Sequence, residues 1–162
     1  MQARQFELMG VLLLASSGCV EAEEPGPLAG FEAFVGEAWH LEGSHQALSW
    51  GPGRRSVTAK SWFVIDGQEK EVSTGLWYWD PAREVIRGVF VATDMPVVVF
   101  EYTTRFEGER MVSDLRTIAA DGTTADYIET WEPLEGDRFE WTLLAPTDDG
   151  LQKAMGGTYG RR

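Results

Sequence analysis

Cysteine is nearly absent from this sequence, and basic residues are few. A single cysteine, Cys19, in 162 residues leaves no partner for an intrachain disulfide and no thiolate cluster for zinc. Fourteen Lys and Arg stand against 26 Asp and Glu, for a net charge of -12 at pH 7. Because a surface that follows phosphates needs an excess of basic side chains, this balance argues against nucleic acid as a partner. It also disfavours direct adhesion to anionic lipid headgroups.

Histidine and the common catalytic motifs are scarce as well. The only histidines are His40 and His45, and on one regular strand residues five apart point to opposite faces, which makes a poor metal pair. No histidine follows His45, so we expect neither a haem axial ligand nor a zinc site. A Gly-x-Ser-x-Gly elbow and a P-loop are also missing. The sequence implies no cofactor.

The apolar run near the N-terminus is far shorter than the ~20 residues needed to span a bilayer. Residues 8–15 follow Arg4 and precede Ser-Ser-Gly-Cys19, an order typical of a secretory signal peptide. The small residues before Cys19 resemble a bacterial lipoprotein box, in which the cysteine is the cleavage and lipidation site. We therefore expect a signal peptide over residues 1–19 and an acidic, Pro-rich tether over residues 20–27.

This reading predicts an exported protein anchored to a bacterial membrane, facing the periplasm or the cell surface. The lipid at Cys19 would be its only membrane contact. An ordinary leader, or a cytosolic chain with a chance cysteine, is the alternative.

The rest of the chain is punctuated by turn signals such as Asp66-Gly67 and Asp121-Gly122, with runs rich in Val, Thr, Trp and Tyr between them. This pattern predicts an antiparallel meander, preceded by one short helix over residues 28–35. About nine strands in one meander favour an all-β, closed up-and-down barrel over residues 28–162, because closure removes unpaired edges. A two-sheet sandwich is the alternative. Residues 42–55 are expected to form a lid or a disordered connection.

The turns also predict how the strands pair. The loop after Phe106 pairs Thr104 with Ser113. A three-residue loop that ends at a left-handed Gly122 then pairs Ser113 with Glu129. A two-residue turn would shift the register by one and turn charged side chains in among the aromatic ones.

The next hairpin is expected to pair Trp131 with Phe139 and Glu129 with Trp141. In this register four strands share one inner face around Glu129, while Asp114 lies on a solvated outer wall. The expected inner face comprises Phe100, Tyr102, Thr104, Phe106, Met111, Ser113, Leu115, Tyr127, Glu129, Trp131, Phe139, Trp141 and Leu143.

Four short motifs, taken in order, resemble those of lipocalin-like (calycin) barrels, and in particular a bacterial family with many exported members. They are a short helix leading into Val35-Gly36-Glu37-Ala38-Trp39, then Trp62-Phe63-Val64-Ile65-Asp66-Gly67, then Gly75-Leu76-Trp77-Tyr78-Trp79-Asp80-Pro81, and a closing Gly157-Thr158-Tyr159-Gly160-Arg161-Arg162. The resemblance implies that Trp39 closes the barrel under Arg161 or Arg162, a cation–π contact worth about 0.5–2 kcal/mol. It also implies a small-molecule cavity, without a settled activity.

Glu129 is the sharpest candidate for function. The predicted register buries it beside Ser113 and Trp141, with Tyr127 and Thr104 nearby. Because an unpaired carboxylate in an apolar site is costly, we expect a raised pKa or a partner. Such a group suits a ligand anchor or a general acid or base. The alternative is a hydrated carboxylate at the barrel mouth, or one that makes structural hydrogen bonds.

The leading hypothesis is an extracytoplasmic protein that binds a small, largely apolar or aromatic molecule. Seven tryptophans suit flat apolar ligands, although such rings can equally fill a solid core. The alternatives are a barrel enzyme, an isomerase or hydrolase using Glu129 with Tyr102 or Tyr127, and a solid-core interaction module. The residues expected to contact ligand are Tyr102, Thr104, Ser113, Tyr127, Glu129, Trp141, Trp77 and Trp79.

Overall fold

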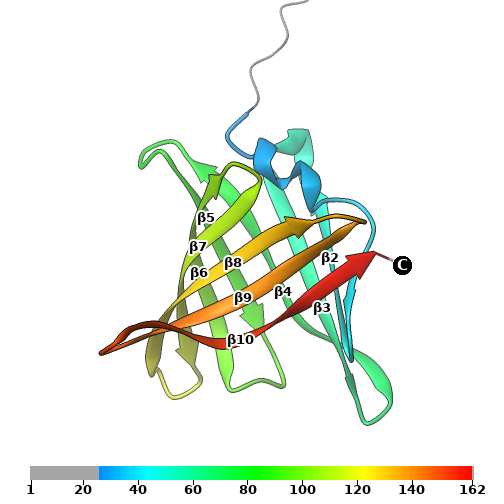
Figure 1. Ribbon diagram of the computed structural model, residues 1–162, viewed down its shortest axis with the longest axis vertical. Helices are drawn as coiled ribbons and strands as arrows, with labels where there is room; N and C mark the ends of the chain where they lie inside the picture. The colour runs from blue at the N-terminus through cyan, green and yellow to red at the C-terminus, as the bar shows by residue number, and fades with distance from the viewer. Residues whose placement is uncertain (1–25, 162) are drawn as a thin grey trace, which may run out of the picture.

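Ten antiparallel strands pair with their neighbours and close on themselves in the computed structural model, which describes residues 26–161 (Figure 1). The order around the barrel is β1-β10-β9-β8-β7-β6-β5-β4-β3-β2. The all-β up-and-down barrel is confirmed, with ten strands instead of nine. The strands are β1 (Trp39–Leu41), β2 (Ser44–Trp50), β3 (Ser56–Ile65), β4 (Gln68–Asp80), β5 (Val85–Ala92), β6 (Val97–Glu107), β7 (Arg110–Ala119), β8 (Thr124–Leu134), β9 (Arg138–Thr147) and β10 (Gly150–Arg161).

The segment over residues 42–55 is neither a lid nor a disordered connection. It contains strand β2 and a short 3₁₀ turn, η2 (Pro52–Arg54). Polar residues conceal the alternation of β2, which pairs with β1 on one side and β3 on the other. Because β2 is paired on both edges and β1 also pairs with β10, the sheet closes into a barrel and the two-sheet sandwich is wrong.

A 3₁₀ helix, η1 (Ala29–Ala33), covers one end of the barrel (Figure 1). Its apolar side carries Phe31 into the core, flanked by Leu28 and Phe34, and all three are buried. The Phe31 ring packs edge-on against Phe106 at the end of β6, with 5.1 Å between ring centroids. The end of the barrel beside η1 is therefore filled with aromatic rings.

The predicted register is correct for the strands from β6 to β8. Thr104 pairs with Ser113, and Ser113 pairs with Glu129. The β7–β8 loop has three residues, and Gly122 has a φ of +84°, a conformation in which glycine has no steric cost. Glu129 is 5% exposed and faces inward, while Asp114 is exposed on the outer wall.

The predicted pairing of the β8–β9 hairpin is wrong by two residues. Trp131 pairs with Trp141 instead of Phe139, and Glu129 pairs with Leu143 instead of Trp141. The connection is a three-residue loop over residues 135–137, in which Gly136 and Asp137 both have positive φ. Because side chains alternate with a period of two, a shift of two residues leaves every side chain on its predicted face.

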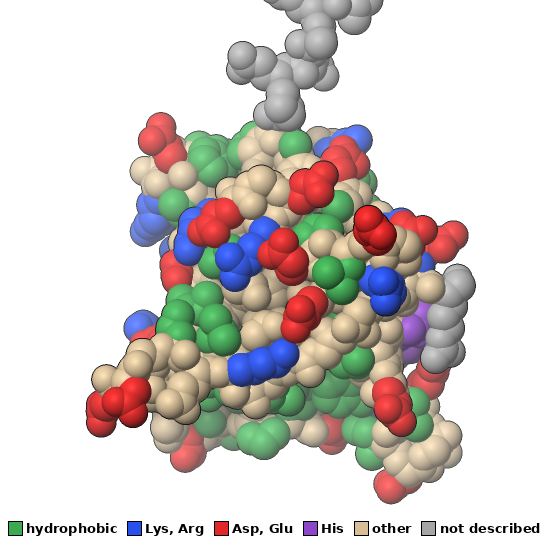
Figure 2. Space-filling view, viewed as in Figure 1, with side chains coloured by type: hydrophobic (Ala, Val, Ile, Leu, Met, Phe, Trp, Pro, Cys, Tyr) green, Lys and Arg blue, Asp and Glu red, His purple; other side chains and the backbone are tan. Residues whose placement is uncertain are grey.

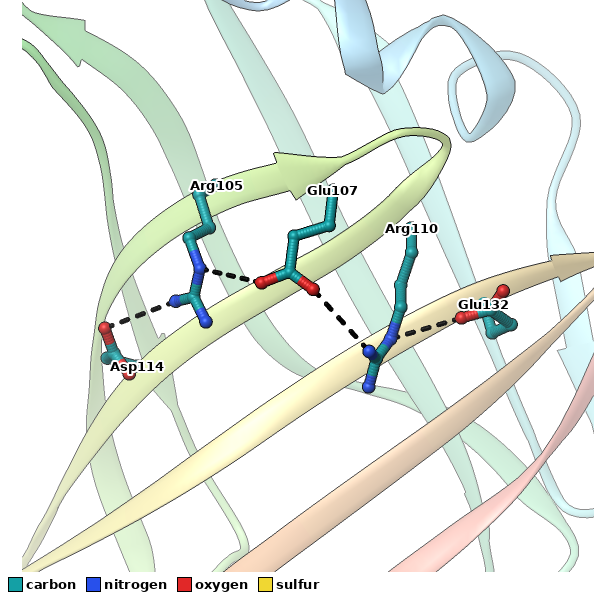
Figure 3. A network of polar contacts seen from close by, with 5 residues as sticks. All are labelled: Arg105, Glu107, Arg110, Asp114 and Glu132. Atoms are coloured by element: carbon teal, nitrogen blue, oxygen red, sulfur yellow. Dashed lines mark hydrogen bonds and ion pairs between the residues drawn. The ribbon is translucent and has the colours of Figure 1, made fainter.

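The outer wall carries interleaved charges (Figure 2). On β6, β7 and β8 the ion pairs form a continuous network (Figure 3). Val112 points outward but is only 3% exposed, and the arginine opposite it in the register, Arg105, belongs to this network. Such exposed pairs each contribute less than about 1 kcal/mol, so the network serves chiefly as a solvated surface. Its members are Arg105, Glu107, Arg110, Asp114 and Glu132.

Several expectations fall outside the described residues. These are the leader over residues 1–19 with Cys19, the tether up to residue 25, and Arg162. Within residues 26–161 no helix has the length and hydropathy needed to cross a membrane.

Candidate functional site

A cavity of about 370 Å³ lies inside the barrel. Its floor includes Trp77, Glu129 and Trp131, and the part of its wall farthest from η1 includes Met95 and Val97. Val97 begins β6, whereas the residue that packs against η1, Phe106, lies near the end of β6. The cavity therefore lies toward the end of the barrel opposite η1.

Glu129 brings the only carboxylate of the described cavity lining. The indole Nε1 of Trp131 donates a hydrogen bond of 2.6 Å to Glu129 Oε1. The Tyr102 hydroxyl donates a longer one, 3.4 Å, to Oε2. Oε1 is thus firmly held by Trp131, while the contact between Tyr102 and Oε2 is long.

Burial raises the pKa of Glu129 to about 7. Desolvation is the largest cause, because an apolar interior disfavours the charged form. Hydrogen bonds from Trp131, Trp141 and Tyr102 act in the opposite direction and lower the pKa. Burial also raises the pKa of Tyr102 well above its usual value, helped by the nearby Glu129 charge, so the phenol keeps its proton and remains a donor.

Strand alternation explains this arrangement. Glu129 and Trp131 are two apart on β8, so both side chains lie on the inner face. Tyr102 faces the same interior from β6, two strands away. With Trp141 from β9, four residues on three strands thus form a carboxylate with three neutral donors.

The cavity floor is a packed group of aromatic rings centred on Trp77. Its ring centroid lies 4.5 Å from Phe90, 5.7 Å from Tyr102 and 6.0 Å from Trp131. Gly88 makes room for this ring, because a Cβ there would lie 2.6 Å from Trp77 Cδ1. Trp77 Nε1 is buried and has no hydrogen-bond partner within the described chain, so the floor holds a spare donor.

Five of the residues expected to contact ligand line this cavity, and three do not. Thr104 and Ser113 are buried, but their hydroxyls bond to each other at 2.8 Å and lie outside the cavity lining. Trp79 lies toward the other end, in a surface cleft beside η1 with Trp50. The five that line the cavity are Tyr102, Tyr127, Glu129, Trp141 and Trp77.

The sequence reasoning missed several lining residues. Trp131 was assigned to the inner face but not to the site, although its position two residues after Glu129 on one strand is a usable signal. Tyr159 and Met155 come from β10, where a register shift between Lys153 and Met155 interrupts the regular alternation of side chains. Phe63 and Met95 complete the mouth, and no pattern in the sequence distinguishes them.

The barrel-closing contact involves Arg161. Its guanidinium carbon lies 4.4 Å from the centroid of the Trp39 ring. Its Nη2 donates to the carbonyl oxygens of Ala33 at 3.2 Å and Val35 at 3.3 Å. Trp39 is buried, and its indole donates to Phe34 O at 2.7 Å. This contact joins the end of β10 to the chain just before β1.

The two histidines lie side by side, contrary to expectation. His40 on β1 pairs with His45 on β2, and the ring centroids are 5.4 Å apart. The chain reverses between them at Gly43, whose φ is +74°, so they do not share one strand. His45 also stacks on Trp62. Across residues 26–161 no group of three His, Cys, Asp or Glu side chains is placed to hold a metal ion.

No protein-family model, curated protein or solved structure matches this chain. The class therefore follows from the fold and the site. It is a closed up-and-down β-barrel with a buried aromatic cluster and an internal cavity. This architecture is compatible with the lipocalin-like, or calycin, barrels.

Proposed function

We propose that this protein binds a small, largely apolar molecule inside the barrel. The carrying observation is the cavity of about 370 Å³, whose lining is mostly aromatic and aliphatic with one buried carboxylate. Small-molecule pockets typically enclose about 300–1,000 Å³ and combine apolar walls with a few polar groups. A solid-core interaction module would have no such space.

The mouth of the cavity supports an apolar ligand. Met155 is 58% exposed and Phe63 is 37% exposed, although both side chains are large and apolar. They line the same cavity as Met95, Pro96 and Val97. Exposed apolar groups gathered around an opening are typical of binding sites.

Titration of the full chain with the neutral fluorescent probe N-phenylnaphthylamine tests this proposal. We expect saturable binding at one site, with the increase in emission that accompanies transfer to an apolar environment. Thr117→Trp, which fills the cavity from β7, is expected to weaken binding at least about tenfold. Thr117 is 7% exposed and lines the cavity.

Thr103→Trp is the matched control, since the same residue type on β6 is exposed on the outer wall. It should bind the probe like the parent. Absence of saturable binding to the parent, or equal weakening by both substitutions, would contradict the proposal.

We also propose that the protein is an exported, lipocalin-like lipoprotein anchored through Cys19. The supporting observation is the order of Arg4, the apolar run and the small residues before Cys19. In a bacterial host the full chain should enter the membrane fraction with an intact mass that fits cleavage before Cys19 plus acyl chains. Cys19→Ser should lose both properties. An uncleaved, soluble parent would contradict the proposal.

The acid–base alternative has one observation in its favour. A carboxyl group with a pKa of about 7 suits proton transfer near neutral pH. However, of the two tyrosines expected to assist it, Tyr102 donates to Glu129 and has a raised pKa, so this phenol keeps its proton and does not serve as a base. We therefore place ligand binding before catalysis.

A further inference from the structure

We propose that the ligand of this cavity is an organic cation, whose protonated amine rests on Glu129 while its apolar body extends toward the mouth. This inference rests on the proposed binding function and adds the chemical class and orientation of the ligand. Charge balance, the aromatic floor and the apolar mouth each support it.

Charge balance is the first support. The described cavity lining contains the Glu129 carboxylate and no Lys or Arg, and His45 is its only basic side chain. The partners of Glu129 are all neutral donors, namely Trp131, Trp141 and Tyr102. A buried charge is stable when it is paired and hydrogen-bonded. A ligand ammonium would supply the opposite charge that this cavity lacks, near Oε2, whose contact with Tyr102 is long.

The aromatic floor is the second support. Trp77 packs against Tyr102 and Trp131, the two residues that donate to Glu129. Trp141 and Tyr159 line the same space. Aromatic faces attract cations, and the attraction is larger in a desolvated site. A carboxylate among such rings is therefore suited to an ammonium group.

The distribution of polarity gives the orientation. The mouth is apolar, with Phe63, Met95 and Met155, and Glu129 lies with the aromatic rings of the floor. A ligand with one charged end would therefore enter with that end first and leave its apolar part at the mouth. The net charge of -12 also favours the approach of cations from solution.

Two other head groups are less suitable. A ligand carboxylate would bring a second negative charge beside ionised Glu129, which is unfavourable in a low-dielectric site, and it would gain no ion pair with protonated Glu129. An alcohol is the closer rival, because a hydroxyl could donate to Glu129 and also accept from the unpaired Trp77 Nε1.

Three probes that share one skeleton test the inference: phenylbutylamine, phenylbutanol and phenylbutanoate. Displacement of N-phenylnaphthylamine from the full chain gives their affinities near neutral pH. The amine is expected to bind at least about tenfold tighter than the alcohol, and the carboxylate most weakly. Glu129→Gln should remove the preference for the amine while leaving the alcohol within about threefold of the parent.

Glu101→Gln is the matched control. Glu101 lies on β6 next to Tyr102 in the sequence, but its carboxylate is exposed on the outer wall. It should retain the preference for the amine, which excludes a general effect of protein charge. Retained binding of the fluorescent probe shows that Glu129→Gln keeps its cavity. If that variant fails to fold, the preference of the parent for the amine over the alcohol decides whether the ligand is a cation.

The outcomes separate the two proposals. If the alcohol binds as tightly as the amine or more tightly, or if Glu129→Gln keeps the preference for the amine, the proposal of a cationic ligand is wrong. The proposal that the cavity binds an apolar molecule is then unaffected. If neither the fluorescent probe nor any of the three compounds binds, the proposed function itself is wrong, and the inference is overturned with it.

Discussion

Glu129 shows how one residue couples the fold to the pH of its surroundings. Its side chain leaves water on folding and gains only neutral donors. Because the protonated form is favoured inside the barrel, folding raises the pKa from 4.5 to about 7. The folded state thus binds more protons than the unfolded state between these values, and the unfolding free energy falls as the pH rises through this range.

Glu129→Gln should abolish this dependence. The stability that comes from protonated Glu129 is complete below about pH 4.5 and is lost as the pH rises through about 7. Relative to the variant, the unfolding free energy of the parent should fall by about 2–3 kcal/mol between about pH 5 and about pH 8. Urea denaturation of both proteins at each pH measures this difference.

Glu101→Gln again serves as the control. Its exposed side chain meets water in both states, so its difference from the parent should stay nearly constant with pH. A constant difference for Glu129→Gln as well would show that Glu129 is hydrated in solution.

At the scale of elements, turn geometry decided which register predictions succeeded. In the β7–β8 loop a single Gly122 with positive φ, preceded by Asp121, indicated the loop length correctly. In the β8–β9 connection Gly136 and Asp137 both adopt positive φ. Non-glycine residues adopt that conformation less often than glycine, although Asp does so more readily than most, and the turn signal Glu135-Gly136-Asp137 does not by itself fix the length of the loop.

Closure of the barrel depends on a short strand. β1 has three residues and makes two residue pairs with β10, Trp39 with Arg161 and His40 with Gly160. Arg161 strengthens this seam through the Trp39 ring and the carbonyl groups of Ala33 and Val35. A single guanidinium thus joins β10, β1 and the chain that follows η1.

Arg161→Lys is expected to weaken this seam. A lysine ammonium keeps the charge but cannot reproduce the planar fork that stacks on the ring and reaches two carbonyl groups. We expect a loss of about 1–2 kcal/mol in unfolding free energy. Amide hydrogen exchange should also become faster in β1 and at the end of β10, with smaller changes elsewhere.

Arg116→Lys provides the comparison. Arg116 pairs with Asp126 on the outer wall, where both side chains are more than half exposed, so the loss should stay below about 0.5 kcal/mol. Equal losses for the two substitutions would show that Arg161 acts only as a surface charge.

At the scale of the whole molecule, the cavity is a product of closure. Tyr159 reaches it from β10 and Phe63 from β3, and Glu129 lies between them on β8. None of these strands is next to another in the sequence. The candidate site therefore has no compact sequence motif.

The sequence by itself determined the period-two alternation, the turns, and hence the all-β barrel with Glu129 inside and Asp114 outside. These features depend on local backbone preferences and on the polarity of adjacent residues. Only the tertiary structure decided that β2 is a strand, that Thr104 and Ser113 satisfy each other, and that Trp131 and Tyr102 hold the carboxylate. Those outcomes depend on how distant strands meet and how their side chains share the interior, which no local pattern encodes.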